Sequence, residues 1–328
     1  MLRTQPDRQK GRTFMGFLWV PIILVLLLLL FFAAGLVLLD YCCGRRDRPD
    51  PWLEESIHRR GFDALKEGIL GGKAWLEGQE REDVTVTSFD GLRLHGLFVP
   101  NPRGKGTLLL FHGWRSTWKT DFIIALPFYY SLGLDLLLVD QRAQNGSEGK
   151  YIAYGVLERE DLAVWVDWAA RRLGKDRPLF LGGLSMGAST VLMAADEPFK
   201  ANVRGIIADC GFTSPYAIIR SVAARGKDRP LRLIMAWLDL FTRCFAGFRL
   251  RQRSTVEALR KTKLPVLLFH GLADDFVPAA MSRESFEACA GERELVLVDG
   301  AGHGMSFVVE PALVKEKIAA FVRSHLEN

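Results

Sequence analysis

A long apolar stretch without a polar face lies close to the N-terminus of the chain. Phe14 to Leu39 contains no charged residue, and Ile22 to Phe32 contains only Leu, Ile, Val and Phe. A helix of this length, rising 1.5 Å per residue, crosses a hydrocarbon core of roughly 30 Å. The stretch therefore predicts a transmembrane signal anchor over residues 14–41. A cleaved signal peptide is the alternative, although its apolar part is usually shorter.

Basic residues flank this stretch on both sides. Those before it are Arg3, Arg8, Lys10 and Arg12, and those after it are Arg45, Arg46 and Arg48. Orientation follows the side that carries more Lys and Arg, so the narrow excess on the N-terminal side predicts a cytoplasmic N-terminus. We therefore expect a single-pass membrane protein whose main domain is extracytoplasmic.

The pattern of apolar positions changes after the anchor. Val84 and Val86 alternate with polar residues, and Asp90-Gly91 separates them from Leu92 and Leu94, which predicts a β-hairpin. Short, fully apolar strands separated by helical patterns follow. These predicted strands are Thr107–Phe111, Leu134–Val139, Leu179–Gly182, Val203–Ala208, Pro265–Phe269 and Leu295–Val298. The alternation indicates an α/β fold with a mainly parallel central sheet flanked by helices.

One long segment interrupts this alternation and predicts an insertion. Residues 212–263 read as helix without a strand, at a position where a helical lid would be inserted. The remaining chain fits one domain better than two. The expected organisation is a basic tail (1–13), the anchor (14–41), a linker and N-terminal helical region (42–82), the first part of the core (83–211), the lid (212–263) and the second part of the core (264–328).

Charge is concentrated in the predicted lid. The chain has 43 Lys and Arg against 38 Asp and Glu, a net charge of +5, while residues 212–263 alone carry +9 and the rest −4. A cationic helical surface with interleaved apolar residues binds anionic lipid headgroups. The candidate lipid-facing residues are Arg249, Arg251, Arg253, Trp237 and Phe241. The alternative is that the apolar positions pack the lid onto the body while the basic ones face solvent.

The cysteines do not indicate a cross-linked or metal-binding protein. They are Cys42, Cys43, Cys210, Cys244 and Cys289. Their number is odd and no Cys-x-x-Cys pair occurs, so neither a disulfide framework nor a zinc site is predicted. The sequence implies no metal and no organic cofactor, and the lack of a nucleic-acid-binding motif argues against nucleic acid as a partner.

A motif for nucleophilic chemistry joins a predicted strand to a predicted helix. Gly183-Leu184-Ser185-Met186-Gly187 places a serine where a sharp turn exposes its Oγ above the sheet. Glycines two positions before and after leave room where a side chain would collide. The start of the following helix provides free N–H groups for a developing oxyanion. The context predicts Ser185 as a nucleophile.

A serine nucleophile needs a general base, and the chain has six histidines. His303 lies in a glycine-rich loop directly after the last predicted strand, which is where the base belongs when the order is serine, acid, histidine. The other five are expected to be structural or at the surface: His58 and His325 in amphipathic segments, His95 on the hairpin, and His112 and His270 shaping loops at strand ends.

A carboxylate should orient the imidazole of the base and stabilise its charged form. Asp274 and Asp275 both follow the strand that ends at His270, and both satisfy the chain order. The spacing from the strand end favours Asp274, with Asp275 capping the next helix. Asp209, at the end of an earlier strand, is a second alternative.

Two backbone N–H groups are expected to form an oxyanion hole. One belongs to Met186, directly after the nucleophile, and the other to Trp114, in the loop after the strand that ends at Phe111. Each such donor contributes about 3 kcal/mol to transition-state stabilisation.

These motifs together resemble the α/β-hydrolase superfamily, from about Asp83 to the C-terminus. The segments that carry the resemblance are Phe111-His112-Gly113, Asp140-Gln141-Arg142, Ser147-Glu148-Gly149, Gly183-x-Ser185-x-Gly187, His270-Gly271-x-x-Asp274-x-x-Val277-Pro278 and Gly302-His303. Within the superfamily, the chain looks like bacterial serine hydrolases related to lysophospholipases, monoacylglycerol lipases and serine aminopeptidases. It departs from them at Arg142-Ala143-Gln144, where relatives usually have Arg-Gly-x, and at Ala188-Ser189, where many peptidase relatives have a further glycine. The second departure favours esters.

The expected function is hydrolysis of carboxylic esters, including lipid or lysolipid esters, through an acyl-enzyme on Ser185. The expected partners are a small-molecule or lipid ester and the membrane that holds the anchor; the sequence predicts no oligomeric state. A peptidase or amidase of the same fold is one alternative, because the same triad cleaves amides. A non-catalytic, membrane-tethered binding protein is the other, since fold alone does not imply catalysis.

Overall fold

An eight-stranded sheet forms the centre of the protein, as seen in a computed structural model that describes residues 10–46, 49, 52, 63–225 and 231–326. Parts of four predicted segments therefore lie outside the described residues: residues 1–9 of the basic tail, residues 47–48, 50–51 and 53–62 of the linker with His58, residues 226–230 of the lid, and residues 327–328 of the second part of the core.

The sheet has the predicted α/β character. Its strands are β1 (Glu82–Thr87), β2 (Arg93–Val99), β3 (Gly106–Phe111), β4 (Leu134–Val139), β5 (Leu179–Leu184), β6 (Val203–Asp209), β7 (Val266–Gly271) and β8 (Arg293–Val298). Their order is β1-β2-β4-β3-β5-β6-β7-β8. The pairs β1–β2 and β2–β4 are antiparallel and every other pair is parallel, so the predicted hairpin and the predicted parallel strands are both confirmed.

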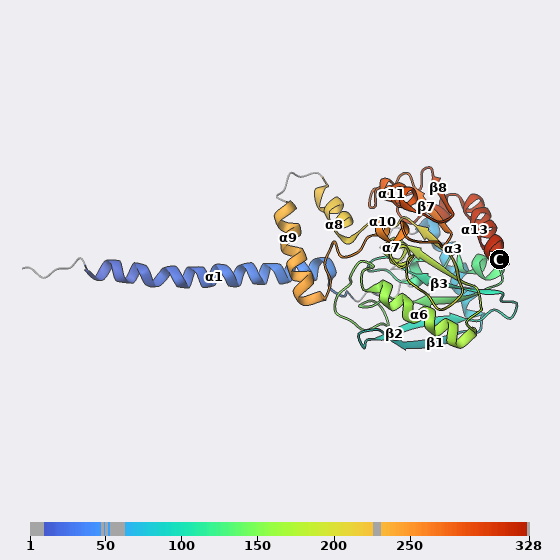
Figure 1. Ribbon diagram of the computed structural model, residues 1–328, viewed down its shortest axis with the longest axis horizontal. Coiled ribbons are helices and arrows are strands. Elements are labelled where there is room, and N and C mark those ends of the chain that lie inside the picture. The colour runs from blue at the N-terminus through green and yellow to red at the C-terminus, as the bar shows by residue number, and fades with distance from the viewer. Residues whose placement is uncertain (1–9, 47–48, 50–51, 53–62, 226–230, 327–328) are drawn as a thin grey trace, which may run out of the picture.

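Helices cover both faces of this sheet (Figure 1). The α-helices are α1 (Lys10–Cys43), α3 (Lys66–Glu77), α4 (Trp118–Asp121), α5 (Leu126–Ser131), α6 (Glu158–Leu173), α7 (Met186–Met193), α8 (Pro215–Ala224), α9 (Leu231–Phe241), α10 (Thr255–Leu259), α11 (Ala280–Ala288), α12 (Ser306–Val309) and α13 (Pro311–Leu326). Helices α3, α5 and α13 pack on one face, and α6, α7 and α10 pack on the other.

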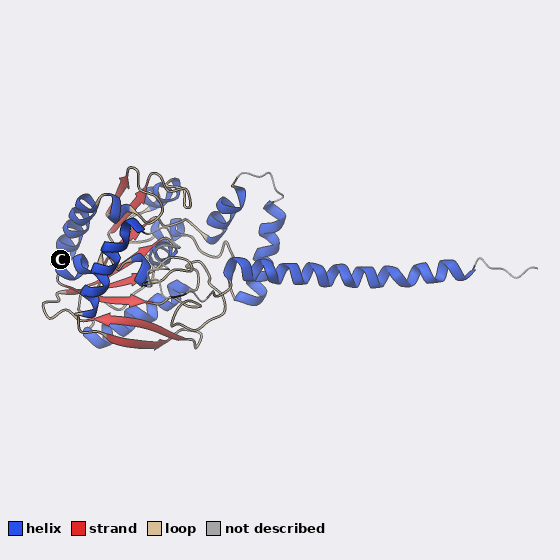
Figure 2. Cartoon of the chain, turned by 180° about the vertical axis from the view of Figure 1, so that it is seen from behind, coloured by secondary structure: helices blue, strands red, loops and turns tan. Residues whose placement is uncertain are grey.

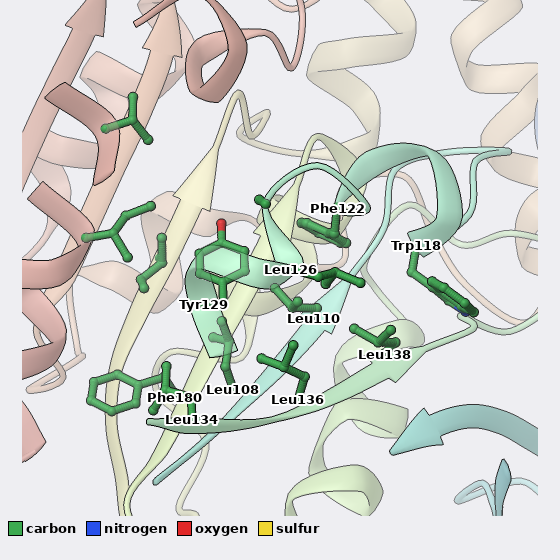
Figure 3. Packing of buried hydrophobic residues seen from close by; sticks show 14 of the residues in the cluster. Leu108, Leu110, Trp118, Phe122, Leu126, Tyr129, Leu134, Leu136, Leu138 and Phe180 are labelled. Atoms are coloured by element: carbon green, nitrogen blue, oxygen red, sulfur yellow. The ribbon is translucent and has the colours of Figure 1, made fainter. Parts of the chain in front are cut away.

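Strand periodicity assigns the two sides of the core. In β3, Leu108 and Leu110 face the cluster under α3, α5 and α13, whereas Leu109 and Phe111 face the cluster under α6 and α7. Side chains alternate in this way because successive residues of a strand point to opposite faces. Figure 3 shows the first cluster, with Leu108, Leu110 and Tyr129 packed together. Every residue of β3 and β4 is buried, as expected for strands covered on both sides.

Helix α1 extends far beyond the domain and is a candidate transmembrane span (Figures 1 and 2). Its segment Trp19–Cys43 has a mean hydropathy of 3.4, and the side chains from Trp19 to Ala33 are all exposed. The last turns are docked on the domain, where Leu39 and Cys43 are fully buried. The helix is therefore apolar along the part that projects and packed along the part that ends at the sheet domain.

Side chains of the sheet domain donate hydrogen bonds to the backbone carbonyl oxygens at the C-terminal end of α1. The Arg115 guanidinium donates hydrogen bonds to the carbonyl oxygens of Tyr41 and Gly44, both at 2.9 Å, and the Tyr154 hydroxyl donates to the Cys42 carbonyl at 2.7 Å. The last carbonyls of a helix have no partner within the helix, so these bonds fix the end of α1 on the domain.

The inserted segment is helical where it is described. Residues 212–225 and 231–263 contain α8, α9, a π-helical turn (Thr242–Ala246) and α10, and no strand.

The expectation that His325 lies at the surface is wrong, because this residue is only 9% exposed. Its ring packs on Phe321 at a centroid distance of 4.6 Å and its Nδ1 lies 2.7 Å from the Phe321 carbonyl oxygen, so the last turn of α13 covers it.

A buried arginine ties three elements of the core together. Arg142 follows β4, and its guanidinium donates two hydrogen bonds to Asp161 of α6, at 2.6 and 2.7 Å, and two to Asp90 in the hairpin turn, at 3.0 and 3.1 Å. The side chains of Arg142 and Asp161 are 3% and 5% exposed. A buried carboxylate that has lost its partner is strongly unfavourable. Removing only one member of this ion pair therefore destabilises the fold more than replacing both members with apolar residues.

Replacing Arg142 with alanine is therefore expected to lower the free energy of unfolding by about 3–5 kcal/mol, because Asp161 would be left buried and unpaired. Urea unfolding followed by tryptophan fluorescence measures the change. The control is Arg172→Ala, which breaks an exposed pair with Glu82 at 3.7 Å and should change stability by less than about 1 kcal/mol. Equal losses in the two variants would contradict the role of Arg142.

Candidate active site

The turn between β5 and α7 holds Ser185 in a strained backbone conformation. Its φ is 55° and its ψ is −115°, in a region that L-residues rarely adopt. A Cβ at Gly187 would collide with the backbone of Phe111, and one at Gly183 would collide with Gly187. The Ser185 N–H donates to the Asp209 carbonyl oxygen at 2.8 Å, which ties the turn to β6. The glycines are thus required by close packing around the serine.

Three side chains from separate strand ends meet at this turn. His303 Nε2 lies 2.8 Å from Ser185 Oγ, and His303 Nδ1 lies 2.7 Å from Asp274 Oδ2. The three residues follow β5, β7 and β8, so the carboxyl ends of parallel strands bring them together. The structure therefore places the three residues expected as nucleophile, base and acid within hydrogen-bonding distance, in the order that a catalytic triad requires.

Asp274 is held as a carboxylate. Its Oδ1 accepts hydrogen bonds from the backbone N–H groups of Phe276 and Val277, both at 2.8 Å, and its Oδ2 also lies 3.2 Å from His270 Nε2. Burial alone would raise the pKa of Asp274, but the hydrogen bonds from His270, His303 and the backbone outweigh it and hold the pKa well below its usual value. An ionised Asp274 can orient the imidazole and stabilise an imidazolium.

The two alternative acids lie elsewhere. Asp275 is exposed, and no hydrogen bond joins it to His303 within the described chain. Asp209 accepts a hydrogen bond from the Ser306 hydroxyl at 2.9 Å. Of the three candidates, Asp274 alone reaches the ring nitrogen of His303.

The expected oxyanion loop lies beside the serine and is firmly held. Asp121 accepts hydrogen bonds from the Gly113 N–H and the Ser116 hydroxyl, both at 2.6 Å. Within the described residues, neither the Trp114 N–H nor the Met186 N–H donates to any acceptor. Both donors are thus available to an oxygen of a bound molecule.

A cavity of about 490 Å³ opens at Ser185 and continues along the sheet. Its volume is in the usual range for small-molecule sites, roughly 300–1,000 Å³. It runs below α3, α5 and α13 on the face of Leu108 and Leu110. Other apolar residues that line it are Ile69, Phe122, Ile207, Phe269, Val314 and Ile318. No described residue of segment 212–263 lines this cavity, so the space next to the serine lies in the core and not beneath the insertion.

The candidate lipid-facing residues are divided between different environments. Trp237 stacks on Phe31 at a centroid distance of 4.9 Å, and Phe241, 3% exposed, packs on α1 beside Phe32 at 5.6 Å. The Arg251 guanidinium lies over the Tyr216 ring at 3.6 Å, and Arg249 is exposed.

The expectation that Arg253 faces lipid does not match its position. Its guanidinium pairs with Asp196 and donates to the Met193 carbonyl oxygen at 2.8 Å, and its side chain is 16% exposed. The positive charge is satisfied within the domain, which explains why this arginine turns inward.

Among the described residues, one group of possible metal ligands overlaps with the site and shares Asp274 and His303 with it. Cys210, Asp274 and His303 present ligand atoms within 4.8 Å of one another. Burial raises the pKa of the Cys210 thiol well above its usual value, and the other two side chains are hydrogen-bonded to each other. A protonated thiol and an occupied pair make a poor ligand set for a metal ion, since the thiolate is the ligand form.

A serine on a strand-to-helix turn, an acid and a final-loop histidine on a mainly parallel sheet define the α/β-hydrolase class of proteins. The chain belongs to the alpha/beta hydrolase family, whose model matches residues 108–316. It is similar to the uncharacterized protein YqkD of Bacillus subtilis, with 24% identity over 75% of this chain and 81% of that protein. The uncharacterized protein Rv2307c of Mycobacterium tuberculosis is 27% identical over 73% of this chain and 78% of its own length.

Solved structures show the same fold. The esterase Pf2001 of Pyrococcus furiosus superposes with a TM-score of 0.61 at 24% identity, covering 76% of this chain and 94% of that chain. Est1E of Butyrivibrio proteoclasticus, solved with ferulic acid bound, superposes with a TM-score of 0.57 at 19% identity, covering 75% of this chain and all of that one.

Exchange of Asp274 for asparagine is expected to lower kcat for 4-nitrophenyl butyrate by about 10⁴-fold, because the amide would favour the wrong tautomer of His303. Initial rates of nitrophenolate release measure the loss. Asp275→Asn is the matched control and should stay close to the unmodified chain. A similar loss in both variants would contradict the choice of Asp274.

Proposed function

We propose that the protein is a membrane-anchored serine hydrolase that cleaves carboxylic esters, including lipid or lysolipid esters. The observation that carries the proposal is the 2.8 Å contact between Ser185 Oγ and His303 Nε2 at the mouth of an apolar cavity. The contact supplies an activated nucleophile, and the cavity supplies a place for an apolar acyl group.

The reaction follows from the positions of these atoms. Ser185 Oγ attacks the ester carbonyl carbon while its proton passes to His303 Nε2. The N–H groups of Met186 and Trp114 hold the oxyanion, and the proton then passes to the departing alcohol as the C–O bond breaks. Water, deprotonated by the same histidine, attacks the acyl-enzyme and releases the acid and the free serine. Asp274 keeps the imidazole oriented throughout.

The depth of the cavity supports an acyl group of medium length. Leu110 and Leu108 lie two residues apart on the same face of β3, which corresponds to about 7 Å along the strand. The cavity continues from the serine past both of them to Val314 and Ile318 of α13. Pf2001, one of the solved structures with the same fold, is named as an esterase, in line with this substrate class.

Labelling by a fluorophosphonate tests the proposal most simply. The full chain in detergent is expected to be labelled covalently, and Ser185→Ala is expected to lose the label, because the reagent reacts with an activated serine. Ser189→Ala, one turn further along α7, is the control and should still be labelled. Labelling that persists in Ser185→Ala would refute the assignment.

A substrate panel separates esters from amides. We expect hydrolysis of short and medium 4-nitrophenyl esters, lysophospholipid or monoacylglycerol, and little hydrolysis of aminoacyl amides. Rates for amides above those for esters would move the proposal to the peptidase alternative.

The arrangement of α1 and α9 supports attachment to a membrane. Residues 14–32 alone supply about 28 Å of helix, close to the hydrocarbon thickness of a bilayer, so Phe31 and Phe32 would lie at its boundary. Trp237 and Phe241 of α9 contact these two residues. Figures 1 and 2 show that α9 crosses α1 instead of running along it. With α1 across the bilayer, α9 would lie along the membrane surface.

The outer side of α9 has the chemistry of an interfacial helix. Leu233 and Leu240 are 74% and 49% exposed, and Phe245, in the following turn, is 43% exposed. Arg232, next to Leu233, and Arg243, between Leu240 and Phe245, are exposed as well. Apolar side chains that enter the acyl boundary and arginines that meet anionic headgroups are the two components of interfacial binding. The basic residues before the apolar stretch of α1 (Arg3, Arg8, Lys10 and Arg12) outnumber those after it (Arg45, Arg46 and Arg48), which favours an extracytoplasmic domain.

Gly35 of α1 lies directly against α9, since a Cβ there would collide with the Phe241 ring. Gly35→Leu is therefore expected to displace α9 and to increase tryptic cleavage after Arg232 and Arg243 about tenfold, since each lost ring contact is worth about 0.5–1.5 kcal/mol. The protein is reconstituted in anionic vesicles and cleavage is followed by mass spectrometry. Val37→Leu, at a position that is 70% exposed, is the control with matched hydrophobicity. The same cleavage rate in both variants would contradict the docking of α9.

A further inference from the structure

Besides Ser185, His303 and the polar residues that follow β3 (Arg115, Ser116, Thr120 and Asp121), two polar groups line the mainly apolar cavity that begins at Ser185. They are the Tyr129 hydroxyl, from α5, and the Asp209 carboxyl, from the end of β6. Polar groups buried without a partner are costly, typically 1–3 kcal/mol each, so their presence in such a wall requires a reason.

The Tyr129 side chain is nine-tenths buried but its hydroxyl has no partner. The residue is 8% exposed, and its hydroxyl forms no hydrogen bond with any residue in the described ranges. Figure 3 shows the hydroxyl turned away from Leu134 and Phe180, toward the ends of the strands where the serine lies. Burial raises the pKa of Tyr129, with a further contribution from the nearby Asp209 charge, so the group is a neutral phenol that both donates and accepts.

Asp209 has one free oxygen. Its Oδ1 accepts from the Ser306 hydroxyl at 2.9 Å, while Oδ2 accepts from no group in the part of the chain that the structure describes, and no arginine or lysine there forms an ion pair with it. Its side chain shares a face with Ile207, two residues earlier, and that face lines the cavity. Burial raises the pKa of Asp209, as expected for a carboxyl group that lacks a cation.

Asp209 is a neighbour of the nucleophilic serine, so Asp209 and Tyr129 lie on the path of an acyl group bound to Ser185. Its backbone carbonyl accepts the Ser185 N–H at 2.8 Å, so the two residues are direct neighbours across β5 and β6. An acyl chain that leaves Ser185 Oγ and enters the cavity must pass Asp209 within its first few carbons. It then passes Tyr129, whose ring lies beside Leu108 and Leu110 in the same cluster.

We propose that Tyr129 and Asp209 form a polar subsite that binds a hydrogen-bond donor, a hydroxyl or an ammonium group, on the first carbons of the acyl chain. The preferred substrates are then hydroxyacyl or aminoacyl esters with an apolar remainder. The proposal rests on the proposed function, because it assigns the acyl group of that same reaction. A site built to pair with a donor rejects the analogue that lacks it far more strongly than an apolar pocket rejects a missing methylene.

A structural role for Asp209 has to be separated from this binding role. The Asp209–Ser306 bond also connects β6 to the loop that carries His303. Asp209→Asn keeps an oxygen acceptor for Ser306 but removes the charge that an ammonium would meet. Tyr129→Phe removes only the hydroxyl. Ser306→Ala removes the connection to the loop and leaves the carboxylate, and therefore serves as the control.

The test compares three ethyl esters with the full chain in detergent: hexanoate, 3-hydroxyhexanoate and 3-aminohexanoate, with acid release followed at constant pH. For the intact protein, kcat/KM for at least one substituted ester is expected to exceed that for hexanoate by tenfold or more. Tyr129→Phe should reduce this preference about tenfold, and Asp209→Asn should reduce the preference for the amino ester by up to about a hundredfold, in line with hydrogen bonds to neutral and charged groups. Ser306→Ala should lower all three rates alike and leave the ratio unchanged.

The other possible results contradict either the polar subsite alone or the subsite together with the proposed function. Hydrolysis of hexanoate at the same or a higher rate than both substituted esters would overturn the polar subsite and leave the proposed function in place. An equal fall of all three rates in Tyr129→Phe and Asp209→Asn would reduce both residues to structural roles and also overturn the subsite. Absence of hydrolysis of every ester would overturn the proposed function together with the subsite.

Discussion

The backbone conformation of Ser185 is the constraint on which the site depends. A positive φ at a residue with a side chain persists only where the surroundings over-determine it. Here, the register of β5 against β6 fixes the N–H of the serine, and the close approach of Gly187 to Phe111 of β3 fixes the start of α7. The strand ends that hold this turn also deliver Asp274 and His303, so a single sheet edge positions both the strain and the groups that use it.

Two adjacent residues, Trp114 and Arg115, connect the end of α1 with the loop that is expected to hold the oxyanion. Arg115 binds the last carbonyls of α1, and its neighbour Trp114 offers the N–H expected to hold the oxyanion. Removal of α1 would leave this guanidinium without those carbonyls and would expose the apolar cluster around Leu39 and Phe241. Helix α1 is thus a part of the domain's packing as well as the proposed membrane anchor, and the insertion packs on α1 instead of covering the cavity.

The sequence was sufficient for the features that depend on local pattern and chain order. Fully apolar runs predicted the strands, and the strand–turn–helix context of Ser185 with a last-loop His303 predicted which side chains would meet. It was insufficient where the outcome depends on which partner is nearby. A count of basic residues did not show that Arg253 pairs with Asp196, and nothing local in α5 shows that the Tyr129 hydroxyl faces a cavity. The sequence identified Asp209 as an acid at the edge of the sheet that carries the serine, but its hydrogen bond with Ser306 could be found only from the tertiary contacts.

Direct detection of the covalent intermediate tests the central claim, that Ser185 is acylated by esters. The full chain is mixed with 4-nitrophenyl hexanoate, quenched with acid within milliseconds, digested and analysed by mass spectrometry. The account predicts a hexanoyl adduct on the peptide that contains Ser185, formed together with a stoichiometric burst of nitrophenol. Nitrophenol release at a steady rate with no adduct, or an adduct on another residue, would contradict it.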